Sequence, residues 1–541
     1  MFAFIFKKKK VLISVFLAGF VFIIIGASNS DTYRSIARSQ RIINEVYKHL
    51  IVNYVDELDT DEFTKTSINN MLSDLDPYTV YLESEDRDNL DMLTHGKYGG
   101  VGIQLGKRDD HLTVISPMED SPAMRAGILS GDIISKIDKE EVKDISLDDA
   151  AKLIRGKKGT TVVLTIIRIE KEEPIEFYLT RTDIMVQDVP YAEMINDDIG
   201  YIVLTRFSKN APLEMKNALR SLIDQGMNNL ILDLRNNPGG LLSAAIEILE
   251  LIFPKGEKLL WTKGRTKESN REFISRKNPL LDYKVKIAVL INEGSASASE
   301  ILSGVIQDLD RGIVIGNKSF GKGLVQSVYG IDQNRSLKVT TAKYYIPSGR
   351  LIQKPDYLNE KVVKNVVLED SVFTTMNGRN VLGNGGITPD STITPERMAA
   401  LSSQYWRRGY FYSFAQQNKH RYQTFSEVLD DLTIIDKFNE FIKEQEDDTQ
   451  LPGEKELGQV KEKIAALDSM NAEVNQALET LSQFYANQEE KSIASESEDI
   501  RQVIILEFAG LMNGPEGRVK QALKDDKIVK VALDILSDKL V

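Results

Sequence analysis

Ser297 is the residue whose type and surroundings best suit nucleophilic chemistry. It lies in the run SASASE (295–300), between an apolar segment at 286–291 that predicts a strand and apolar residues at helical spacing from Ile301 onward. A helix that begins here would direct its unpaired N–H groups and its dipole at the loop, and both favour an oxyanion beside the serine. The alternative interpretation is an ordinary helix-capping serine.

A serine hydroxyl needs a base before it becomes a good nucleophile, and this sequence offers a lysine rather than a histidine. Burial lowers the pKa of a lysine, so that part of it is neutral near pH 7. Lys322, in the run SFGKGLVQ (319–326), is the candidate base; its flanking glycines permit close packing of the backbone, and Gln326 is spaced to orient it. The alternative is a solvated loop lysine. The histidines all lie outside 184–395, the segment that holds Ser297: His49, His95, His111 and His420.

Other kinds of site fit the sequence less well. Residues 316–322 match the first half of a phosphate-binding loop, but Gly323 stands where Ser or Thr would hold magnesium. The chain has no cysteine and its histidines are scattered, which argues against a metal-dependent hydrolase. A formal net charge of -12 disfavours binding to nucleic acid. We expect no metal, no cofactor and no nucleic-acid partner.

The N-terminus indicates export. Four lysines at 7–10 precede an uncharged run at 11–27, which is near the short limit for a membrane span and is followed by small residues typical of signal cleavage. Residues 1–30 are therefore either a cleaved signal peptide or a retained signal anchor. Both place the remaining chain on the extracytoplasmic side, in the periplasm or facing it, with inner-membrane contact if the segment is retained.

The elements that must position Ser297 and Lys322 fall into four further segments of a multidomain α+β protein of 541 residues. Apolar residues at helical spacing predict a helical domain at 31–95, and short β-branched runs punctuated by glycine predict a β module at 96–183. Strands alternate with helices at 184–395, which predicts a mostly parallel sheet covered by helices. The segment at 396–541 is polar and helical.

Three motifs closely resemble the carboxyl-terminal processing peptidases, also called tail-specific proteases: SASASEI (295–301), FGKG with Gln326 (320–326) and LDLRNNPGG (232–240). The resemblance covers about 31–395 and implies a crotonase- or Clp-like core. It also implies Ser297 as nucleophile, Lys322 as base and Gln326 as the residue that orients the lysine. The Ala298 amide and one of two glycines, Gly239 or Gly240, match the family's oxyanion hole.

The β module resembles a PDZ domain, which binds a terminal carboxylate with the backbone N–H groups of a glycine loop and adds the peptide to a strand edge. The residues that match this loop are Gly100, Val101, Gly102 and Ile103. We expect a pocket lined by residues such as Ile103 and Leu153 to favour an apolar last residue. Arg155 either couples tail capture to the catalytic loop or is a surface charge. The alternative for the whole module is a structural glycine hairpin.

Together these features predict a serine endopeptidase that binds the exposed C-terminal tails of proteins or peptides and cleaves them through an acyl-enzyme, without a cofactor. The competing hypothesis is a catalytically inactive PDZ scaffold of the cell envelope that binds protein tails. Residues 396–541 carry no recognisable chemistry, and we expect them to dock an adaptor, build a homo-oligomer or gate the site.

Overall fold

The computed structural model describes residues 33–83, 96–108, 111–118, 120–142, 145–168, 171, 173–354, 371–383, 385–394, 398–445, 453–465 and 472–537. It divides into two units, Met1–Tyr81 and Leu82–Val541, which are treated separately below. The predicted export segment at 1–30 lies outside the described residues. In the part of the chain that the structure describes, no helix has the length and apolar character needed to cross a bilayer.

The first unit holds a helix at 33–53 and helix α2 (Thr60–Leu72). Asp59 caps α2, because its carboxylate accepts from the N–H groups of Asp61 and Glu62. The rings of Tyr47 and Phe63 lie 5.9 Å apart and join the two helices. Strand β1 (Val80–Leu82) follows.

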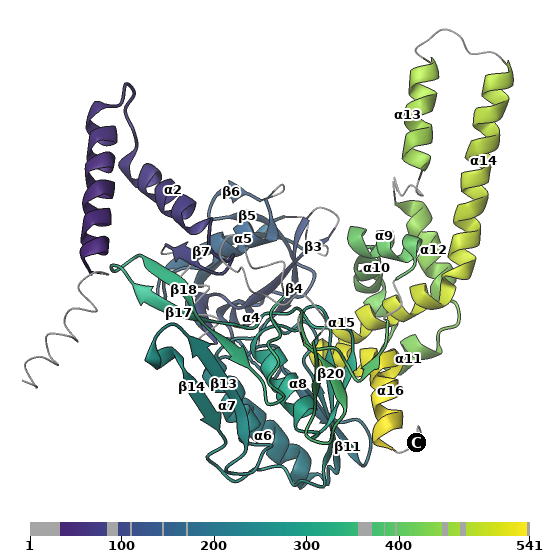
Figure 1. The fold of residues 1–541 in the computed structure, drawn as a ribbon. Coiled ribbons are helices and arrows are strands. Elements are labelled where there is room, and N and C mark those ends of the chain that lie inside the picture. The colour runs from purple at the N-terminus through teal and green to yellow at the C-terminus, as the bar shows by residue number, and fades with distance from the viewer. Residues whose placement is uncertain are drawn as a thin grey trace, which may run out of the picture. The chain divides into compact units, whose positions relative to one another are not determined.

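The β module is built around one antiparallel sheet in the order β3-β4-β5-β7-β8, with β6 paired to β5 (Figure 1). A separate pair, β2 and β9, closes it. Strand β3 begins at Ile103, because Gly102 has φ +73° and breaks the extended chain before it. The elements are β2 (Lys97–Gly100), β3 (Ile103–Arg108), β4 (His111–Pro117), α4 (Pro122–Ala126), β5 (Ile133–Ile137), β6 (Glu140–Glu141), α5 (Leu147–Ile154), β7 (Thr161–Ile167), β8 (Ile175–Thr180) and β9 (Thr182–Met185).

The core sheet runs β10-β11-β12-β15-β16-β21. Every neighbouring pair is parallel except β10 with β11, so the mostly parallel sheet predicted from the sequence is present. Its elements and connecting helices are β10 (Tyr191–Met194), β11 (Ile199–Val203), α6 (Ala211–Asp224), β12 (Asn229–Asp233), α7 (Leu242–Leu249), β15 (Lys286–Ile291), α8 (Ala298–Asp308), β16 (Ile313–Gly316) and β21 (Ser391–Thr392).

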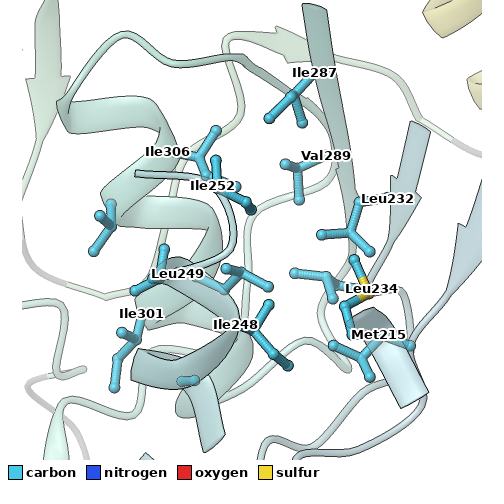
Figure 2. Packing of buried hydrophobic residues seen from close by; sticks show 14 of the residues in the cluster. Met215, Leu232, Leu234, Ile248, Leu249, Ile252, Ile287, Val289, Ile301 and Ile306 are labelled. Carbon is cyan, nitrogen blue, oxygen red and sulfur yellow. The ribbon is translucent and has the colours of Figure 1, made fainter. Parts of the chain in front are cut away.

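One face of this sheet packs against α6, α7 and α8. Alternate residues of a strand point to the same face, so Leu232 of β12 and Val289 of β15 share this side and meet Met215, Ile248 and neighbouring apolar residues (Figure 2). Burying each of these side chains contributes about 1.5–3 kcal/mol relative to exposure. The packing fixes the carboxyl ends of the strands, where the loops of interest begin.

The other face of the core sheet is covered by α16 (Lys527–Leu536), the last helix of the chain. Ile231 and Leu290 point to this side and pack with Ile528, Val529 and Leu536. Strands that are buried on both faces need a layer of structure on each side. A helix that lies far from the α/β segment in sequence therefore belongs to the packing of the core sheet.

A second, antiparallel sheet carries β18 next to β13, β13 next to β14, and β17 paired to β18. Its strands, with the small elements nearby, are β13 (Lys258–Gly264), η1 (Lys267–Ser269), β14 (Arg271–Ile274), β17 (Leu324–Gly330), β18 (Ser336–Tyr345) and the pair β19 (Val372–Thr374) and β20 (Asn380–Leu382). Strand β17 directly follows the Lys322 loop and pairs with β18.

The C-terminal segment is helical, as predicted, and is held by an aromatic cluster in which the Phe411 and Phe438 rings stack 4.9 Å apart. Helices α13 and α14 lie against each other (Figure 1). The elements are α9 (Ala400–Arg408), α10 (Tyr410–Asn418), η3 (Lys419–Arg421), α11 (Phe425–Asp430), α12 (Ile434–Glu444), α13 (Glu454–Ala465), α14 (Ala472–Ser495) and α15 (Ser497–Asp525), which kinks at Gly514 before α16.

Candidate active site

Ser297 lies at the junction between strand and helix that the sequence predicts. Strand β15 ends at Ile291, and Ser297 is the N-cap of α8 with φ 55° and ψ -110°. A positive φ is uncommon for a residue with a side chain and costs free energy that the surroundings must supply. The packing of α8 compensates for this cost, because all residues of the helix are buried.

The Glu300 carboxylate joins the Ser297 loop to the Lys322 loop. One oxygen, Oε2, accepts from the backbone N–H of Ser297 (2.7 Å) and from that of Lys322 (2.8 Å). The other, Oε1, accepts from the Ser319 hydroxyl (2.5 Å) and the Gly321 N–H (2.6 Å). The backbone nitrogens of Ser297 and Lys322 are therefore close neighbours, because they share one acceptor atom.

Glu300 is fully buried. Burial raises the pKa of its carboxyl above the ordinary value, and the hydrogen bonds from Ser319, Lys322, Ser297 and Gly321 oppose that rise. Four donors around one carboxylate are the environment in which a buried charge is tolerated. The arrangement fixes the backbone of both loops relative to one acceptor.

Tyr344 of β18 holds the same two residues from their carbonyl side. Its hydroxyl lies 2.6 Å from the Lys322 carbonyl oxygen and 3.1 Å from the Ser297 carbonyl oxygen. Burial, and next the charge of Glu300, raise the pKa of Tyr344 well above its ordinary value, so the hydroxyl stays protonated and donates. Ser297 and Lys322 are thus held together by an acceptor for their N–H groups and a donor for their carbonyls.

The glycines beside Lys322 allow close backbone packing, as the sequence suggests. A Cβ on Gly321, which has φ +92°, would lie 2.6 Å from Lys354 Cγ, and one on Gly323 would lie 2.9 Å from the Gln353 nitrogen. The Lys322 side chain is partly buried. Gln326, the predicted orienting residue, lies on β17, and its Nε2 is 3.5 Å from Thr340 Oγ1, the limit of a hydrogen bond.

The predicted oxyanion loop lies against the nucleophile turn. A Cβ on Gly239, which has φ +96°, would come within 2.6 Å of the Ala296 carbonyl oxygen and 2.9 Å of the Ala298 nitrogen. The Gly239 N–H donates to Asn237 Oδ1 at 2.9 Å. The N–H groups of Ala298 and Gly240 have no hydrogen-bond partner among the described residues. Between the two glycines, the geometry favours Gly240 as the donor to an oxyanion.

Side chains join this loop to the nucleophile turn. Ser295 Oγ donates to the Leu234 carbonyl (2.8 Å), and Ser299 Oγ donates to the Asn237 carbonyl (2.9 Å). Asn292 Oδ1 accepts from the Asn236 N–H at 2.8 Å. The outer serines of the SASAS run thus connect the two loops, whereas the middle serine, Ser297, forms the capping box of α8 with Glu300.

The β module carries a pocket of about 220 Å³ beside the predicted tail-binding residues. Gly102 and Ile103 line it together with Ala151, Ile154 and Arg155, among others. Leu153 does not, because it lies on another side of α5 and is 37% exposed. The apolar part of the lining includes Ile103, Ala151 and Ile154, the charged part is Asp148 and Arg155, and the expectation for Leu153 was wrong.

Arg155 caps the end of α5 and stacks on the Tyr98 ring, 4.8 Å from its centre. Burial raises the pKa of Tyr98, and the charge of Arg155 opposes that rise. The Gly156 N–H donates to the Gly99 carbonyl at 3.1 Å, so this end of α5 is tied to the glycine loop. A guanidinium at that end of the pocket suits a terminal carboxylate.

Sequence reasoning missed the two residues that organise the backbone, Glu300 and Tyr344. A signal for Glu300 was present, because a Glu three residues after an N-terminal serine is the pattern of a capping box. Tyr344 arrives from a distant strand and has no local signal. Among the described residues, no group of three or more His, Asp or Glu side chains is arranged to hold a metal ion.

Three family models match the chain: peptidase family S41 at 198–360, the PDZ domain at 113–168 and the C-terminal helical domain of probable PDZ-proteases at 398–536. The carboxy-terminal-processing protease of Bartonella bacilliformis is 37% identical over 330 residues, 60% of this chain and 74% of that protein. The carboxyl-terminal-processing protease of Synechocystis is 38% identical over 353 residues, 62% of this chain and 81% of that protein.

A probable CtpA-like serine protease of Staphylococcus epidermidis is 36% identical over 313 residues, and the chain spans 62% of its length. Among solved structures, the photosystem II D1 C-terminal processing protease is 26% identical, with a TM-score of 0.36, over 65% of this chain and 87% of that one.

Proposed function

Because the chain belongs to the carboxy-terminal-processing proteases of peptidase family S41, we propose that it is a serine endopeptidase with Ser297 as nucleophile and Lys322 as general base. Ser297 Oγ attacks the scissile carbonyl carbon while Lys322 Nζ accepts its proton. The lysine then gives that proton to the leaving amine as the peptide C–N bond breaks. Water attacks the resulting ester, with Lys322 again as base, and releases Ser297.

The oxyanion that forms in both steps would accept from the N–H groups of Ala298 and Gly240. Two preorganised donors at a helix start are a favourable environment for this charge, and removing one such donor typically costs about 10²–10³-fold in rate. Gly239 contributes differently, because its lack of a side chain lets the loop approach Ala298. Gln326 would orient the lysine from β17.

One observation carries this proposal: Ser297 and Lys322 donate their backbone N–H groups to the same oxygen of Glu300. Residues that are 25 positions apart in the chain are thereby held in one rigid frame. Rigid placement of nucleophile and base supplies much of the rate of an enzymatic reaction, because it replaces a chance encounter by a fixed geometry.

The β module supplies the choice of substrate. We infer that a protein tail adds to the edge of β3 with its last side chain in the pocket formed by Ile103, Ala151 and Ile154, and its carboxylate near Arg155. The apolar residues of this lining favour an apolar last residue. Capture of the tail raises the local concentration of the upstream chain at Ser297. The N-terminal lysines and apolar run support export to the periplasm or attachment to its membrane.

The experiment compares cleavage of β-casein and of a peptide with an apolar C-terminal tail by wild type, Ser297→Ala and Lys322→Ala. We expect both variants to lose at least about 10³-fold in rate while they still bind the tail. Equal cleavage by all three proteins would refute the site. Binding of the tail without any cleavage by wild type would favour an inactive scaffold. Peptides that differ in their last three residues test the β module separately.

A further inference from the structure

The last helix of the chain reaches the loop that carries the oxyanion glycines. Asp526, the N-cap of α16, accepts a hydrogen bond from Arg235 Nη1 at 2.6 Å. Both side chains are about one-fifth exposed, so this ion pair is largely shielded from solvent. Such a shielded, hydrogen-bonded pair is screened less by water and salt than an exposed pair. The pair joins the helix to the core across 291 positions of sequence.

Arg235 is held on the core side by two more groups. Its Nη2 donates to Asp233 Oδ2 at 2.6 Å and approaches the Tyr201 hydroxyl at 3.4 Å, while its backbone N–H donates to Asp233 Oδ1 at 2.9 Å. Burial lowers the pKa of Arg235, but the hydrogen bonds and charge of Asp233, followed by the charge of Asp526, hold it above its ordinary value. The guanidinium is therefore shared between Asp233, at the end of β12, and Asp526, at the start of α16.

Arg235 begins the turn that ends at the oxyanion glycines. The next residue, Asn236, has φ +58°, and its N–H donates to Asn292 Oδ1 in the nucleophile loop. Three residues later, Gly239 packs on the Ala298 nitrogen and the Ser297 Cβ, both within 2.9 Å of an added Cβ. Only a short turn separates Arg235 from the two glycines, so a shift of the Arg235 side chain would displace the proposed oxyanion donors.

Helix α16 is itself firmly seated. Ile528, Val529, Ala532 and Leu536 are buried on the second face of the core sheet. The Asp526 carboxylate also caps the helix, because it accepts from the N–H groups of Ile528 (2.9 Å) and Val529 (3.1 Å). The Asp526 carboxylate therefore caps α16 and also binds the Arg235 guanidinium at the start of the turn.

We propose that Asp526 is a positioning residue for catalysis: through Arg235 it sets the turn that presents the Gly240 N–H to the oxyanion, so that the C-terminal helical segment completes the active site of the core. This role rests on the Ser297–Lys322 chemistry proposed above. Asp526 acts through Arg235 and touches no reacting atom. Its removal lowers the rate of acylation and leaves tail binding by the β module unchanged.

The test separates the two jobs of Asp526. In Asp526→Ser the hydroxyl still caps α16 but is too short to reach Arg235, whereas Asp526→Asn keeps the cap and a neutral contact. Asp525→Ser is the matched control, because the one ion pair of Asp525 among the described residues is with Lys530, at 3.6 Å and with both side chains about half exposed. Each full-length variant is assayed for kcat and KM on the tailed peptide, for tail binding, and for unfolding in urea.

We expect Asp526→Ser to lose about tenfold or more in kcat, with KM and tail binding within about twofold of Asp525→Ser. Asp526→Asn should fall between them. A kcat equal to that of Asp525→Ser would overturn the inference, whatever the change in stability. If Asp526→Ser does not fold, Asp526→Asn decides: an undiminished kcat overturns the inference and a loss of at least threefold supports it. A wild type that leaves the peptide uncut would instead overturn the proposed function.

Discussion

Replacing Glu300 by Gln is the perturbation that most sharply tests the frame around the two reacting residues. The amide has the size of the carboxylate but only one acceptor oxygen. If its NH2 group replaces Oε2, the backbone N–H groups of Ser297 and Lys322 both lose their acceptor. If it replaces Oε1, the Gly321 N–H loses its acceptor and the Ser319 hydroxyl must reorient. Neither orientation preserves all four bonds.

The magnitude follows from these contacts. Each buried N–H without an acceptor costs about 1–3 kcal/mol, and the bonds that remain lose their charge assistance. Relief of the desolvation that raises the Glu300 pKa offsets part of this cost. We therefore expect a loss of about 2 kcal/mol in the free energy of unfolding. The rate should fall further, by about 10²-fold, because small displacements between nucleophile and base are costly.

The assay is steady-state cleavage of the tailed peptide together with urea unfolding. Glu250→Gln is the control, because Glu250 is 5% exposed and its carboxylate accepts from the Arg276 N–H (3.0 Å) and pairs with Lys277 (3.1 Å), with no contact to Ser297 or Lys322. The control should lose stability and keep its kcat. If Glu300→Gln behaves as the control does, the reasoning about the frame is refuted.

Three further predictions address the oxyanion loop, the tail pocket and the pH dependence of stability. Gly239→Ala should abolish cleavage, because its Cβ would meet backbone, whereas Gly226→Ala has a similar φ of +93°, meets nothing within 4 Å and should keep its kcat; equal activities would contradict the packing argument. Ala151→Phe should fill the pocket and raise KM for the tailed peptide at least fivefold, while Leu153→Phe, outside it, should not. Burial raises the pKa of Asp188 to about 6, so the folded protein binds this proton more tightly than the unfolded chain. Wild type should therefore gain stability relative to Asp188→Asn as the pH falls from about 7 to about 4, and parallel curves in urea unfolding would contradict this.

The elements nearest the proposed site were predictable because their signals are local. The apolar run before Ser297 and the helical spacing after it predict strand and helix, and the structure has β15 and α8 there. The glycines around Lys322 predicted close packing, and added Cβ atoms would indeed meet backbone or side chains. The assignments of Ser297, Lys322 and Gln326 to catalytic roles stay predictions.

What the sequence did not reveal depends on contacts between distant segments. Tyr344 reaches both Ser297 and Lys322 from β18, and Asp526 reaches Arg235 from the far end of the chain. Residues 230–232 are apolar on both faces of a strand, which requires cover on both sides, but nothing local indicates that α16 supplies the second layer. The expectation for Leu153 placed it on the wrong side of α5, because side chains one residue apart on a helix point about 100° apart.

The central claim is that the amine of Lys322 removes the proton from Ser297. The most direct measurement is the rate at which a fluorophosphonate reagent labels Ser297, followed by intact mass across pH, in wild type, Lys322→Ala and Lys322→Arg. We predict that wild-type labelling rises through a single ionisation, and that this step disappears in both variants with a rate at least about 10²-fold lower. Labelling of Ser297 with the same rate and pH dependence in all three proteins would contradict the account.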